Sequence, residues 1–89
     1  MIIEKSSLEV TDHDNSGLLP EVVETAIQDI SSVDITVLEG DEHSYLLGIE
    51  YEDVEDIEDV VCAICMLCVS KGIYHFSIHY MGREGGVVR

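Results

Sequence analysis

Residues 33–51 read VDITVLEGDEHSYLLGIEY, two apolar segments on either side of a polar turn. The first segment, 33–38, is rich in β-branched residues, which are typical of strands. In the second segment, 43–51, alternate residues are large and apolar: Tyr45, Leu47, Ile49 and Tyr51. The EGDE sequence at 39–42 is typical of a hairpin loop. The stretch therefore predicts two antiparallel strands.

The sequence that follows this hairpin predicts a helix and a further strand. Asp53 is a suitable N-cap for a helix over about 54–70, and Gly72 is a suitable residue to end it. Residues 73–81, IYHFSIHYM, then alternate strictly, as a strand does. In the alternation one set is aromatic or aliphatic: Tyr74, Phe76, Ile78 and Tyr80.

The sequence before the hairpin predicts a strand and a helix in that order. Residues 2–11, IIEKSSLEVT, predict a strand with Ile2, Leu8 and Val10 on one face. Pro20 suits the first position of a helix, which apolar residues at helical spacing continue until Ser31. The apolar residues of this helix are Val23, Ala26, Ile27 and Ile30.

The predicted order, β-α-β-β-α-β, favours a single α+β domain over residues 1–89. We expect a ferredoxin-like sandwich, in which two helices cover one face of a four-stranded antiparallel sheet. Residues 82–89 are rich in glycine and predict a loose tail, in which Val87 and Val88 could pair at a sheet edge. The fold itself does not predict a function, since this architecture carries many unrelated activities.

The charge of the chain is very uneven. There are 19 acidic and 4 basic residues, a formal net charge of −15, and from Ser6 to Ser70 there are 17 acidic residues and no Lys or Arg. Nucleic acid and anionic membranes are poor partners for such a chain, because phosphate binding depends on Lys and Arg. Adaptation to high salt, mimicry of a polyanion and a dedicated basic partner are the three explanations.

The densest acidic segment is EYEDVEDIED at 50–59, with seven carboxylates in ten positions. Val54, Ile57 and Val61 predict the inward face of the helix, so the Glu-Asp pairs between them point outward. Helix carboxylates three and four positions apart resemble the close charges of a nucleic-acid backbone. We expect a partner-binding surface here and at the acidic hairpin loop. Its predicted residues are Glu50, Glu52, Asp53, Glu55, Asp56, Glu58, Asp59, Glu39, Asp41 and Glu42.

Three cysteines, Cys62, Cys65 and Cys68, have the spacing C-x-x-C-x-x-C. No fourth cysteine is present and apolar residues separate the three, so we expect core packing rather than a metal site and predict no cofactor. The surrounding segment, 60–69, is apolar nearly all round. The tail, a neighbouring loop or another chain would have to cover its outer side, and a homodimer through this part of the helix is one alternative.

Residues 12–17, DHDNSG, resemble the first half of a calcium loop, but Val23 stands where the loop needs a bidentate carboxylate. We therefore expect an ordinary Asx-rich turn. The four histidines form no convincing site, because His75 and His79 are about 13 Å apart along an extended strand and His13 and His43 lie in or beside acidic loops. Surface or structural roles are expected for all four.

No nucleophile motif or phosphate-binding glycine loop is present, and no catalytic residue is predicted. An odd number of cysteines without a signal peptide indicates a reducing cytoplasm. We expect a non-enzymatic inhibitor or decoy that binds a basic nuclease, nucleic-acid-binding protein or toxin, as a phage-type anti-defence protein or a toxin-immunity protein would. The alternative is a ligand-sensing or oligomerising ferredoxin-like module from a salt-adapted cell.

Overall fold

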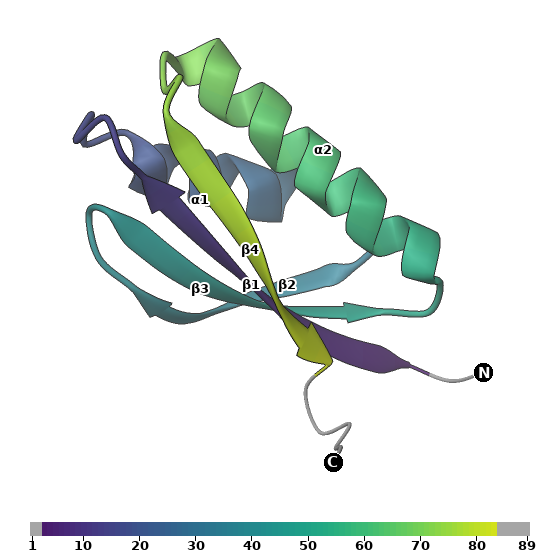
Figure 1. Cartoon of the computed structure of the whole chain (residues 1–89). Helices are drawn as coiled ribbons and strands as arrows, with labels where there is room; N and C mark the ends of the chain where they lie inside the picture. The colour runs from purple at the N-terminus through teal and green to yellow at the C-terminus, as the bar shows by residue number, and fades with distance from the viewer. Residues whose placement is uncertain (1–2, 84–89) are drawn as a thin grey trace.

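The computed structural model describes residues 3–83, which form four strands and two helices. The strands are β1 (Glu4–Asp12), β2 (Asp34–Gly40), β3 (Ser44–Tyr51) and β4 (Phe76–Arg83). The helices are α1 (Leu19–Asp29) and α2 (Val54–Lys71). All strand pairs are antiparallel, in the order β2-β3-β1-β4, and both helices lie on one face of the sheet (Figure 1). This is the predicted ferredoxin-like sandwich.

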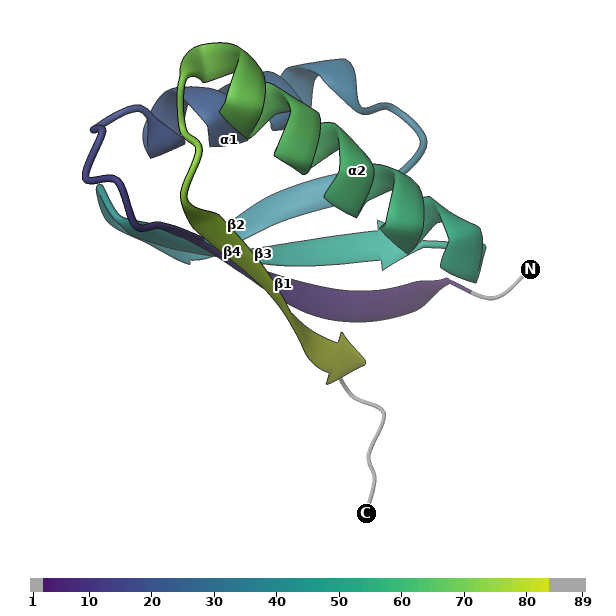
Figure 2. The ribbon, with the colours of Figure 1, turned by 45° about the horizontal axis from the view of Figure 1, so that its top comes forward.

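The hydrophobic core lies between the sheet and the two helices (Figure 2). The central strands β1 and β3 contribute Leu8, Val10, Leu47 and Ile49, each at most 1% exposed. Helix α1 contributes its buried residues at helical spacing: Leu19, Val22, Val23 and Ala26. Helix α2 contributes Val60, Ile64 and Cys68, which follow one another every four positions and therefore share one face.

Two polar residues of β1 also lie on the buried face. Ser6 is 1% exposed, and its hydroxyl lies 2.8 Å from the Tyr51 hydroxyl and 3.0 Å from that of Tyr80. Asp12 is 3% exposed and accepts hydrogen bonds from the loop that follows it. These hydrogen bonds allow both polar side chains to be buried, because a buried polar group without a partner destabilises the fold by about 1–3 kcal/mol.

Some predicted details were wrong. The last strand begins at Phe76 rather than at residue 73, because Ile73 packs in the core beside the C-terminus of α2 and its amide donates to the Cys68 carbonyl. Helix α1 begins at Leu19, one residue before Pro20. Ile2 and the Val87–Val88 pair lie outside the described residues.

Candidate functional site

The start of α2 is built by Asp53. Its backbone is extended, and its carboxylate accepts a hydrogen bond of 3.1 Å from the amide of Glu55, as an N-cap does. Glu55 and Asp56 occupy the first turn, where the helix dipole favours negative charge. Glu58 and Asp59 lie beyond that turn, so the dipole does not explain them.

The predicted carboxylates at this end of the molecule face solvent. Glu58 and Asp59 are exposed, as are Glu52 and Glu55, and only Asp56 is partly covered. Val54 was predicted on the inward face but is 62% exposed, whereas Val60 is fully buried. The inward stripe begins at Ile57, which packs against the core, whereas Val54 lies in the first turn of α2.

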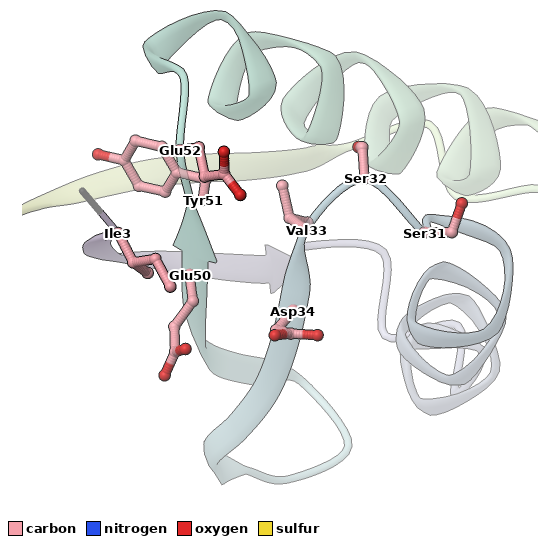
Figure 3. A pocket seen from close by; sticks show the side chains of 8 residues that line it. All are labelled: Ile3, Ser31, Ser32, Val33, Asp34, Glu50, Tyr51 and Glu52. Carbon is pink, nitrogen blue, oxygen red and sulfur yellow. The ribbon is translucent and has the colours of Figure 1, made fainter. Parts of the chain in front are cut away.

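A hollow of about 170 Å³ lies beside these carboxylates, between the start of β2 and the end of β3 (Figure 3). Asp34, Glu50 and Glu52 line it, and Asp34 pairs with Glu50 across the two strands. Sequence reasoning missed Asp34. The signal that could have found it is the register of the hairpin. A β-bulge between Val37 and Glu39 shifts this register by one residue, so the pairing of Asp34 with Glu50 could not be recognised from the sequence.

We call this set of carboxylates the acidic end. It contains eight of the 19 acidic residues: Asp34, Glu50, Glu52, Asp53, Glu55, Asp56, Glu58 and Asp59. Among the side chains that the structure describes, only one Lys or Arg contacts it, through the pair between Lys5 Nζ and Glu50 Oε2 at 3.7 Å. The acidic end is therefore a dense negative surface with little counter-charge of its own.

The hairpin carboxylates do not join this surface. Asp41 and Glu42 lie between β2 and β3, at the opposite end of β3 from Glu50 (Figures 1 and 2). The eight residues of β3 separate the two places by about 24 Å. The predicted partner-binding residues therefore lie in two separate regions, and their role in binding stays a prediction. Glu39 was also predicted in the loop but lies within β2, which continues to Gly40.

Asp41 has a structural role in the hairpin loop. Its carboxylate accepts hydrogen bonds from the amides of His43, at 2.7 Å, and Ser44, at 2.9 Å. These two bonds, with that from His43 the stronger, lower the pKa of Asp41 below its usual value. All three hairpin carboxylates, Glu39, Asp41 and Glu42, are exposed at this end.

The cysteines divide between core and surface. Cys68 is fully buried as predicted, Cys65 is partly covered, and Cys62 is exposed, contrary to prediction. Each step of three residues turns about 60° around the helix, so a stripe with this spacing leaves the core within two steps. Burial, with smaller effects of Cys65 and Asp12, raises the pKa of Cys68 to about 11.

The outer side of α2 carries an apolar patch, formed by Cys65, Met66, Val69 and Ser70. Met66 is 73% exposed and Val69 is 51% exposed. Within residues 3–83 no loop covers these two side chains, so the predicted homodimer contact and the tail stay open as predictions.

The loop between β1 and α1 is held by protein donors. Asp12 accepts bonds from the Asp14 amide and from the Ser16 amide and hydroxyl, at 2.7–3.0 Å. Burial by itself raises the pKa of Asp12, but these bonds outweigh it and the pKa lies below its usual value. The predicted Asx-rich turn is confirmed.

Asp14 ties this loop to the segment before β4. Its carboxylate accepts bonds from the amides of Tyr74 and His75, and its Oδ1 lies 2.7 Å from His75 Nδ1. His13 contacts Ser77 through Nε2 at 3.1 Å. Both histidines therefore have structural contacts, and the carboxylates of the calcium-like sequence are already occupied by protein donors.

Within residues 3–83, no three His, Cys, Asp or Glu side chains are placed to hold a metal ion. Neither α1 nor α2 combines the length and the hydropathy that crossing a membrane requires.

Comparison with known proteins gives the fold alone. The sequence matches no protein-family model and no curated protein. The structure is similar to part of a hydantoinase/carbamoylase family amidase from Burkholderia ambifaria, with a TM-score of 0.51 and 10% identity over 92% of this chain and 28% of that chain. It also resembles a de novo designed protein with a ferredoxin fold (TM-score 0.46, 10% identity, 100% and 93% covered). A prephenate dehydratase from Streptococcus mutans gives a TM-score of 0.40 at 21% identity, over 90% of this chain and 42% of that chain. The chain thus spans less than half of both natural enzymes, and the likeness at these identities concerns architecture.

Proposed function

We propose that this protein is a non-enzymatic inhibitor or decoy whose acidic end binds the basic surface of a nuclease, a nucleic-acid-binding protein or a toxin. The observation that carries the proposal is the position of Glu58 and Asp59. Both are exposed, neither has a Lys or Arg contact among the described side chains, and both lie beyond the first turn of α2. Their charges are repelled by the neighbouring carboxylates of the helix and so destabilise it. We infer that these two residues are present because they bind a basic partner.

The physical basis of binding is electrostatic complementarity. A surface with one sign of charge attracts an opposite surface over a Debye length of about 8 Å at physiological salt and raises the association rate. Carboxylates three and four positions apart on α2 are separated by about 5–6 Å at Cβ, a spacing that suits a groove built for phosphates. The partner would supply the counter-charge that the acidic end lacks.

Binding to a labelled arginine-rich peptide, measured by fluorescence anisotropy at 0.15 M salt, tests the proposal. The variant Glu58→Lys/Asp59→Lys should bind the peptide about tenfold more weakly, since an exposed close charge pair is worth about 0.2–1 kcal/mol and each reversal replaces an attraction by a repulsion. The matched control is Glu24→Lys/Asp29→Lys, which makes the same change of net charge at two exposed positions on α1. A second assay measures whether the wild-type protein displaces duplex DNA from the peptide.

If both double variants lose affinity equally, the acidic end is not a specific surface and the proposal fails. That result would favour the salt-adapted module. Two observations support this second candidate: α1 also exposes carboxylates at Glu21, Glu24 and Asp29, and α2 exposes the apolar patch. A salt-adapted domain should unfold on dilution into low salt, whereas a decoy should stay folded there.

A further inference from the structure

Strand β2 forms an open edge of the sheet. Within residues 3–83 its one sheet neighbour is β3, so the outward backbone groups of β2 have no strand beside them. Its side chains are also uncovered: of the seven residues, all except Ile35 are exposed. An exposed edge of this kind accepts an extended segment from another chain, because its N–H and C=O groups are ready to pair.

The two edges of the sheet differ in charge. The β4 edge, Phe76–Arg83, contains no carboxylate and includes His79 and Arg83. The β2 edge contains Asp34 and Glu39 and no basic residue. Furthermore, β2 runs between the two acidic regions, since Asp34 belongs to the acidic end and Gly40 leads into the acidic hairpin loop (Figures 1 and 2).

Charge decides which segment fits this edge. Antiparallel pairing of β2 with a second copy would bring Asp34 of one copy close to Glu39 of the other, between two chains that each carry a formal charge of −15. Like charges beside each other across strands are destabilising. A basic segment meets the opposite condition, since each of its Lys or Arg residues would lie near a carboxylate of β2 or of the adjoining regions.

We propose that β2 binds an extended basic segment of the partner protein as a fifth strand of the sheet. The seven residues of β2 span about 20 Å, so one such segment reaches from the hairpin loop to the acidic end. It would contact both regions that the sequence predicts for binding, although they lie at opposite ends of β3. This inference rests on the proposed function, because it takes the partner to be basic.

The β-bulge determines where the added strand pairs. It interrupts the regular ladder between Val37 and Glu39, so the regular part of the edge is Asp34–Val37. Val37, 41% exposed, and Leu38, 45% exposed, offer apolar contacts to the segment. Leu38 packs over Gly48, where a Cβ would lie 3.3 Å from a Leu38 methyl group. The segment that fits this edge is one in which basic and apolar residues alternate. It would pair with four backbone residues of β2, contact two apolar side chains and lie near the flanking carboxylates.

Two synthetic peptides test this inference with the full chain. The first is a ten-residue peptide of alternating lysine and valine, and the second is the same peptide methylated on every backbone nitrogen, which keeps the charge but cannot donate to a strand. Loss of two hydrogen bonds at about 0.5–1.5 kcal/mol each should weaken binding of the methylated peptide about tenfold or more. Amide hydrogen exchange followed by NMR should show protection on β2 with the unmethylated peptide alone.

A pair of variants locates the site on the protein. Asp34→Asn/Glu39→Gln should weaken binding of the unmethylated peptide, whereas the control Glu24→Gln/Asp29→Asn, with the same change of net charge, should not. Equal affinity for the two peptides, with contacts at the start of α2, would overturn strand addition and leave the proposed function standing. Protection at β4 instead of β2 would also overturn it. If neither peptide binds at 0.15 M salt, both proposals fail.

Discussion

Removing the charges of Glu58 and Asp59 should stabilise the fold. Both side chains are exposed in the second turn of α2, and the described residues offer them no Lys or Arg partner. A carboxylate that folding requires makes a hydrogen bond or an ion pair, as Asp53 and Asp14 do. The variant Glu58→Gln/Asp59→Asn therefore separates a structural role from a binding role.

The size of the effect follows from the spacing on the helix. Three pairs of like charge involve these positions: Glu55 with Glu58, Glu55 with Asp59, and Asp56 with Asp59, each three or four residues apart. At about 0.2–0.5 kcal/mol per pair, removing them should raise the free energy of unfolding by about 0.6–1.5 kcal/mol at low salt. For a domain of this size the melting temperature should rise by about 2–12 °C.

Urea and thermal unfolding at low salt and at 1 M salt measure this effect. At 1 M the Debye length is about 3 Å, shorter than the spacing between the side chains, so the stability gain should nearly vanish. Asp53→Ala is the control, because loss of the N-cap should cost about 1 kcal/mol at either salt concentration. If Glu58→Gln/Asp59→Asn is as stable as the wild type or less stable at low salt, these carboxylates support the fold and the reasoning is refuted.

Three further predictions concern other parts of the molecule. The bonds from Tyr74 and His75 lower the pKa of Asp14 below its usual 3.8, so their contribution to stability is present above that pH and is lost as the pH falls through the lower, folded-state value. Asp14→Ala should therefore be less stable than the wild type at pH 7, and unfolding curves should show this gap narrowing below pH 3.8. If a second copy covers the apolar patch, sedimentation should show a dimer at high salt that Met66→Glu abolishes, and a monomer at every concentration would refute the predicted homodimer. Cys62 should react with a thiol reagent in the folded protein while Cys68 reacts only on unfolding, because burial covers Cys68 and raises its pKa to about 11; equal rates would show that the core opens readily.

Local patterns in the sequence were sufficient for the order of elements and for the fold. Alternation in 43–51, a capping aspartate at 53 and a glycine at 72 act over a few residues, so each could be recognised without knowing the rest of the chain. The structure confirms Asp53 as the N-cap of α2 and places Gly72 at its end with φ of +100°. The excess of carboxylates over basic residues was likewise evident from the sequence.

The arrangement of the charges required the tertiary structure. Asp34 and Glu50 are sixteen positions apart in the chain and meet only through the register of β2 and β3, which the bulge shifts. The same topology places the hairpin loop far from the acidic end. Sequence therefore determined that the protein is a strongly acidic α+β sandwich, because strand and helix patterns are local. Which carboxylates share a surface, and which strand is left open beside them, was decided by strand pairing between distant residues.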